Sequence, residues 1–223
     1  MKRLVTILTF VITLNAFSQE TIERKIGDFN ELKVYDLIEV ELVKSDKNKV
    51  EISGQNIDNV LVNNLNGTLK IKMAFKEIFD GANTKVVLYY TKLDIIDANE
   101  GARIHSKDDI KQFEIDLRTQ EGGNINVNLD VSYANIKAVT GGVVEINGVA
   151  KKEKVSLTTG GVFKGEHLKS ENSDVAINAA GEAYINASNE VNITIRAGGD
   201  VYVYGNPKTI NETKVLGGRV KRM

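Results

Sequence analysis

The chain has 223 residues, with 29 basic and 30 acidic side chains, a formal net charge of -1 and an isoelectric point near 6.2. This balance excludes recognition of nucleic acid or of an anionic membrane through a strong positive field. Cysteine is absent, which excludes disulfides, thiolate metal sites, a cysteine nucleophile and a lipid-bearing cysteine.

An export signal is predicted at residues 1–18. Lys2 and Arg3 form a charged start, residues 4–14 are almost wholly apolar, and residues 16–18 (AFS) have the small-x-small pattern of a cleavage site. The apolar run of about eleven residues is shorter than a membrane span requires. We therefore expect a mature chain that begins at Gln19 and lies outside the cytoplasm, in the periplasm or at the cell surface.

Strands are predicted from residue 27 onward, because Val, Ile and Leu dominate the apolar residues and recur at strand spacing. Asn66-Gly67 is typical of a hairpin turn, and Pro207 marks a turn near the C-terminus. Residues 74–82 form either one short helix or a loop. The expected strand segments are LKVYDLIEVELV (32–43), KVEISG (49–54), LVNNLNGTLKIKM (61–73) and KVVLYY (85–90).

The second half of the chain repeats with a step of about twenty residues, which indicates a solenoid. The repeat aligns on glycine pairs, and the steps between successive anchors are 21, 19, 19, 20, 18 and 19 residues. The anchors are Ala102, Gly123, Gly142, Gly161, Gly181, Gly199 and Gly218.

Other columns of this alignment are apolar, as the inward positions of stacked coils require. The column six residues before the anchor runs from Ile96 to Ile193, and its last member is Glu212. A terminal coil is expected to be atypical in this way. The column two residues after the anchor holds Ile104, Ile125, Val144, Phe163, Ala183, Val201 and Val220.

Each repeat is therefore predicted to be a strand, a tight turn and a second strand, with coils stacked about 4.8 Å apart by parallel pairing. Glycine serves the turn because it adopts positive φ without a Cβ clash. The glycines differ from phosphate-binding loops, since no helix start with Lys and Ser or Thr follows them. No cofactor is expected.

The chain resembles the extracytoplasmic head GIN domain family, also called the putative auto-transporter adhesin head domain, which is common in Bacteroidota. The resemblance rests on FNELKVYDLIEVELVKSDKNKVEISG, GTLKIKM, ANEGARI and AGGDVYVYGNPKTINETKVLGGRV. It implies an all-β, right-handed parallel β-helix preceded by an irregular β segment, in one domain over residues 19–223 with regular repeats from about residue 94. The family name implies adhesion by analogy, because fold alone does not determine function.

Catalytic and metal-binding patterns are weak in this sequence. His105 and His167 are far apart and lack the spacing of metal ligands, so we expect both at the surface. The carboxylates of DIIDANE (94–100) and KDD (107–109) indicate a Ca²⁺ site, the acidic cluster of a polysaccharide-cleaving enzyme, or only a solvated edge.

The outward columns are the candidate binding surface. Tyr184, Tyr202 and Tyr204 are predicted to form an aromatic platform of the kind that stacks on sugar rings or protein side chains. Asn126, Asn147 and Asn186 add amide donors and acceptors beside it. The same residues would equally form ladders that only stabilise the stack of coils.

We therefore expect an exported, non-catalytic β-helix that binds a polysaccharide or an envelope or surface protein. The alternatives are a polysaccharide-active lyase or hydrolase and a periplasmic structural or stress-linked partner protein. End-to-end homo-oligomers are also conceivable, because the ends of a solenoid expose strand edges.

Overall fold

The computed structural model describes residues 21–223, so the predicted export signal and its cleavage site lie outside the described residues. The described chain is nearly all-β, with 71% of its residues in strands, and about 7 solenoid turns of roughly 19 residues follow an irregular N-terminal region. This confirms the predicted all-β solenoid. No helix between residues 21 and 223 is long and apolar enough to cross a membrane.

The N-terminal region is built from short strands that pair out of sequence order. Strand β3 lies between β7 and β9, and β2 lies between β6 and β8, in both cases by parallel pairing. Antiparallel β4 and β1 continue the sheet beyond β7. The strands are β1 (Thr21–Lys25), β2 (Glu31–Val34), β3 (Glu39–Lys44), β4 (Lys49–Gly54), β5 (Val60–Leu65), β6 (Thr68–Met73) and β7 (Thr84–Tyr90).

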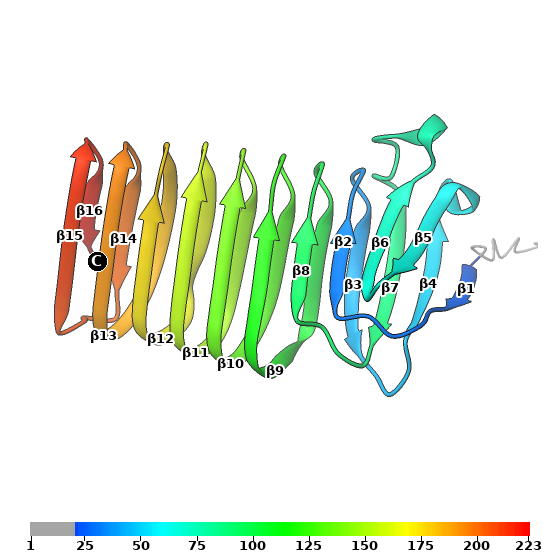
Figure 1. Cartoon of the computed structure of the whole chain (residues 1–223), viewed down its shortest axis with the longest axis horizontal. Coiled ribbons are helices and arrows are strands. Elements are labelled where there is room, and N and C mark those ends of the chain that lie inside the picture. Colours follow the sequence, from blue (N-terminus) through cyan, green and yellow to red (C-terminus); the bar gives the residue numbers. More distant parts are fainter. Residues whose placement is uncertain (1–20) are drawn as a thin grey trace, which may run out of the picture.

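The predicted hairpin joins β5 to β6, and its turn residues Asn66 and Gly67 both have positive φ. Between β6 and β7 the chain forms a loop that holds only the single 3-10 turn η2 (Phe75–Glu77) and projects beyond the strands in Figure 1. A second 3-10 turn, η1 (Ile57–Asn59), precedes β5. The loop alternative for residues 74–82 is therefore nearer to the structure than a helix.

The regular solenoid begins at β8, and from β9 to β14 each strand pairs with the one before it in sequence, whereas β15 pairs with β13 and β16 with β14 (Figure 1). The long strands run along one face, bend, and return along the other face before a tight turn starts the next coil. The strands are β8 (Ile95–Ala98), β9 (Arg103–Thr119), β10 (Asn124–Val139), β11 (Val143–Thr158), β12 (Gly161–Ile177), β13 (Gly181–Ala197), β14 (Asp200–Tyr204), β15 (Thr209–Leu216) and β16 (Arg219–Arg222).

The observed register confirms the alignment on glycine anchors. Val143 pairs with Asn124 and with Val162, so Gly142 lies directly between Gly123 and Gly161 in the stack. The apolar columns point inward: the side chains of Ile125, Val144, Phe163 and Ala183 are fully buried. Because each apolar side chain packs against the coils on both sides of it, one continuous core runs the length of the molecule.

In the pairs at residues 122–123, 141–142 and 160–161 the two glycines serve different purposes, whereas Gly199 and Gly218, the second glycines of later pairs, have positive φ as well. The first glycine of these three pairs has positive φ, as at Gly160 with φ 77, and a Cβ there would meet nothing within 4 Å. A Cβ on the second, Gly161, would lie 2.2 Å from the carbonyl oxygen of Ala138 in the previous coil. The first glycine is thus required by backbone conformation and the second by close approach of two coils.

The last coil departs from the pattern, as predicted. Glu212 and Lys214 occupy the register positions next to Ile193 and Ile195, where earlier coils have apolar residues. The two charged side chains pair with each other at 3.0 Å. Charges in the core columns oppose the stacking of another coil on this end, which is how terminal repeats and strand edges are protected.

Candidate functional site

The two predicted tyrosines lie together on the outer face of the last coils. Tyr184 pairs in register with Tyr202, and their rings stack with centroids 4.7 Å apart and planes inclined by 10°. The Lys221 ammonium lies 5.4 Å from the centroid of the Tyr202 ring. The Tyr202 ring thus stacks on the Tyr184 ring and also interacts with the Lys221 ammonium.

The hydroxyl of Tyr184 donates a hydrogen bond to the Glu182 carboxylate at 3.2 Å. Burial, followed by the negative charge of Glu182, raises the pKa of Tyr184 above its ordinary value. The phenol therefore stays neutral at physiological pH and remains a hydrogen-bond donor. Tyr204 lies beside this pair, in register with Asn186 of the preceding coil.

The predicted asparagines lie on outward positions, but their amides also link neighbouring coils. The Asn147 amide donates to the Asn128 side chain at 3.2 Å, and the Asn186 amide donates to the Glu166 carbonyl at 2.8 Å. The Asn126 amide reaches Glu145 at 3.5 Å and is exposed. The surface thus combines a ladder between coils with polar groups that remain accessible.

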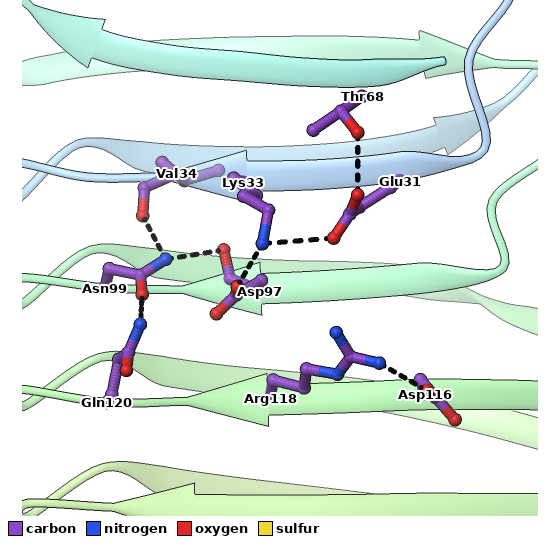
Figure 2. Close-up of polar contacts among 9 residues, drawn as sticks. All are labelled: Glu31, Lys33, Val34, Thr68, Asp97, Asn99, Asp116, Arg118 and Gln120. Atoms are coloured by element: carbon purple, nitrogen blue, oxygen red, sulfur yellow. Dashed lines mark hydrogen bonds and ion pairs between the residues drawn. The ribbon is translucent and has the colours of Figure 1, made fainter. Parts of the chain in front are cut away.

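The carboxylates of the acidic segment 94–109 pair with different lysines and do not form one cluster. Figure 2 shows Asp97 beside Lys33, whose ammonium lies 3.0 Å from both Asp97 and Glu31. Asp94 pairs with Lys92 at 2.8 Å, and Asp109 pairs with Lys111 at 3.6 Å. No group of three or more potential metal ligands occurs within residues 21–223.

The ion pairs of Figure 2 join the N-terminal region to the first solenoid coils. Burial opposes the charge of Lys33, but hydrogen bonds to Asp97 and Glu31 outweigh this effect and raise the pKa of Lys33. A hydrogen bond from the Thr68 hydroxyl at 2.7 Å lowers the pKa of Glu31. On the next strand the Arg118 guanidinium contacts Asp116 at 2.7 Å. These contacts stabilise the charged forms of Lys33 and Glu31 and occupy the hydrogen-bonding groups of both side chains.

The histidines occupy two different environments. The His105 ring nitrogens lie 3.9 Å from Glu39 and 3.9 Å from Glu41 on the adjacent strand β3. His167 is exposed on β12. The two rings therefore do not form a common site.

Asp36 holds the projecting loop, which the sequence pattern did not predict. Its buried carboxylate accepts hydrogen bonds from the backbone N–H of Met73 at 3.0 Å and of Phe79 at 3.3 Å. Burial and the neighbouring Asp36 raise the pKa of Glu100. With the loop held by these hydrogen bonds to Asp36, the Phe75 side chain is exposed at the surface of the loop.

A buried carboxyl group lies inside the solenoid, again without a sequence signal that we used. Glu153 is fully buried, and its Oε1 accepts a hydrogen bond from the Ser170 hydroxyl at 3.2 Å. Its Oε2 and the nearby Ser173 hydroxyl have no hydrogen-bond partner within the described chain. Burial raises the pKa of Glu153 to about 8, so this side chain is a neutral acid at pH 7.

Comparisons with known proteins agree on family and fold. The family model described as "Putative auto-transporter adhesin, head GIN domain" matches residues 28–207. No curated protein matches the chain.

Solved structures with the same fold come from related bacteria. A putative adhesin from Bacteroides fragilis is 18% identical, with a TM-score of 0.84 over 93% of this chain and 98% of its own. A putative adhesin from Parabacteroides merdae is 17% identical, with a TM-score of 0.71 over 93% and 97%. A putative lipid binding protein from Parabacteroides distasonis is 16% identical, with a TM-score of 0.74 over 93% and 98%.

Proposed function

We propose, because the chain belongs to the head GIN domain family of putative auto-transporter adhesins, that it is an adhesin-like binding module of the cell envelope. It is exported by the signal predicted at residues 1–18 and binds a polysaccharide or a surface protein without chemical change. The adhesin descriptions of the structural relatives from Bacteroides fragilis and Parabacteroides merdae support this function.

The observation that carries the proposal is an in-register row of outward side chains. Neighbouring strands lie about 4.8 Å apart, so the row presents an amide, charges of both signs and aromatic rings at a regular spacing. A rigid row of this kind binds a partner with little loss of conformational entropy. Its members are Asn126, Glu145, Lys164, Tyr184, Tyr202 and Lys221.

A non-catalytic role is supported by the engagement of the acidic side chains. Glycoside-cleaving enzymes hold two carboxyl groups across one cleft, with separations set by the reaction. Here Asp94, Asp97 and Asp109 each pair with a different lysine, so none of the three is an unpaired carboxylate. An adhesion module requires only a shaped surface with satisfied polar groups.

The test compares retention on purified envelopes of the source bacterium for two variants of residues 19–223. Tyr184→Ala with Tyr202→Ala is expected to weaken retention at least tenfold, about 1.4 kcal/mol, while the melting temperature changes little. Leu65→Ala, an exposed apolar substitution on the β5–β6 hairpin, is the matched control and should retain full binding.

Two results would contradict the proposal. If the tyrosine variant melts much earlier but is retained normally, the rings form a stabilising ladder and not a binding surface. If the unmodified chain is not retained on any envelope fraction, the adhesin-like function itself is wrong.

A further inference from the structure

A hollow of about 600 Å³ lies where the long strands bend, at the end of the coils away from the glycine turns. It crosses five successive strands, β9 to β13, from Gln112 to Ser188. A second hollow of about 670 Å³ adjoins it and also contains Gln112 in its lining. We call the two hollows together the edge groove, which runs across the stacked coils.

The edge groove has balanced charges and neutral polar groups. The first hollow has two lysines and two acidic residues in its lining, and the second hollow has three of each. Such a lining does not attract a strongly charged polymer. Ser132 supplies a hydroxyl group, and the exposed Val149 supplies apolar surface. This mixture fits the alternating polar and apolar surfaces of a sugar.

An aromatic pair lies beside the groove where its two parts meet. Phe113 and Tyr133 are 68% and 42% exposed, their ring centroids are 5.2 Å apart, and their planes are inclined by 57°. No cation or third ring stacks on either of them within residues 21–223. Both rings are therefore exposed at the surface, and exposed aromatic rings stack on sugars.

We infer that the edge groove binds a neutral, extended polysaccharide chain that lies across the coils, with Phe113 and Tyr133 stacked on its sugar rings. The coils advance by about 4.8 Å, which is close to the advance of one hexose unit in an extended chain. A polymer with this repeat places one sugar on each coil. The inference rests on the proposed function and names the ligand class for a site separate from the Tyr184–Tyr202 row.

The test uses linear neutral oligosaccharides of glucose or N-acetylglucosamine, two to eight units long, titrated calorimetrically into residues 19–223. Affinity is expected to rise with length until about five coils are covered, since five strands line the first hollow. It should also be insensitive to salt, because the ligand is uncharged.

Two variants locate the bound chain. Phe113→Ala with Tyr133→Ala should weaken binding roughly tenfold or more, and Val149→Arg should block the first hollow, which Val149 lines. Phe75→Ala removes an exposed phenylalanine from the projecting loop, far from the groove residues, and should bind as the unmodified chain does. Melting curves of all variants establish that each one is folded.

The groove inference is wrong if no oligosaccharide binds, if affinity is independent of length, or if both groove variants bind normally. If the unmodified chain is retained on envelopes but the groove variants bind the oligosaccharides normally, only the groove inference is wrong and the proposed function stands. Oligosaccharide binding that the groove variants abolish, without retention on any envelope, supports the groove and contradicts the proposed function.

Discussion

The C-terminal solenoid and the N-terminal region are both built from strands and share one continuous core. They differ in how far apart in sequence the paired strands are. In the solenoid each of β9 to β13 pairs with the next strand in sequence. In the N-terminal region β3 pairs with β7 and β9, and residues 45–83 separate β3 from β7. The solenoid therefore gains its stability from local neighbours, whereas the N-terminal region must close long loops before its strands meet.

This difference predicts how far the structural effect of a substitution extends in each region. A coil in the solenoid depends on two neighbours, so a defect there divides the stack at one place. A defect in β3 or β2 removes the contact that joins the irregular region to the first regular coils. The Lys33–Asp97 pair lies at that junction (Figure 2).

The largest expected effect comes from Ile146→Asp, which breaks the solenoid core. Ile146 is fully buried, so the change loses roughly 1.5–3 kcal/mol of apolar burial and also buries a carboxylate without a partner. We expect unfolding or a shortened stack, measured by circular dichroism melting. Asn147→Asp, on the outward side of the same strand, is the control, and equal melting of the two variants would reverse the inward assignment.

Glu153 breaks the uniformity of the solenoid interior and makes its stability depend on pH. The folded pKa of about 8 exceeds the ordinary value of 4.5, so the folded chain holds its proton where the unfolded chain has released it. Stability should therefore fall as pH rises from about 4.5 to 8, by on the order of 1.4 kcal/mol for each pH unit.

Glu153→Gln should remove that dependence and leave a flatter profile. Chemical denaturation at pH 5, 7 and 9 measures both slopes. Identical slopes for the two chains would show that the carboxyl group is not held neutral in the folded state.

Substitutions in one glycine pair test how closely neighbouring coils approach one another. Gly161→Ala should cost about 1–3 kcal/mol, because its Cβ meets the Ala138 backbone at 2.2 Å. Gly160→Ala should cost about 1–2 kcal/mol from positive φ alone. Urea denaturation compares the two, and a larger loss at Gly160 would mean that close approach is unimportant.

The smallest expected effect is at the junction between the two regions. Lys33→Met leaves the mostly buried Asp97 without its cation, at an expected cost of about 1 kcal/mol. Lys33→Met with Asp97→Leu should recover part of that loss, since both charges are then removed. If the double variant is less stable than the single one in urea, the pair does not act as a unit.

The sequence was sufficient to predict the solenoid because its neighbours are local. A step near nineteen residues aligned Gly123, Gly142 and Gly161 correctly, and it also placed Tyr184 beside Tyr202. The pairing of β3 with β7 and β9 left no periodic pattern, because those strands come from distant segments. The N-terminal arrangement was therefore predicted only as irregular β structure, through the family resemblance.

The details of the candidate sites were less predictable. Alignment indicates which side chains are neighbours, but not that Lys221 lies over the Tyr202 ring. At the bends the register shifts between Lys164 and Lys169, so a fixed period loses the residues that line the edge groove. Glu153 shares a column with Ala134 and Ser173 and, farther along the stack, with the buried Ile115 and Val191. That column indicates an inward position, but we did not use it in the prediction from sequence.

The most direct test of the central claim is co-sedimentation of residues 19–223 with purified envelope polysaccharide, with an assay of the same tubes for new reducing or unsaturated sugar ends. The account predicts that the chain is retained and that no new ends form. New sugar ends would show that the solenoid is an enzyme, and the absence of retention would contradict polysaccharide binding.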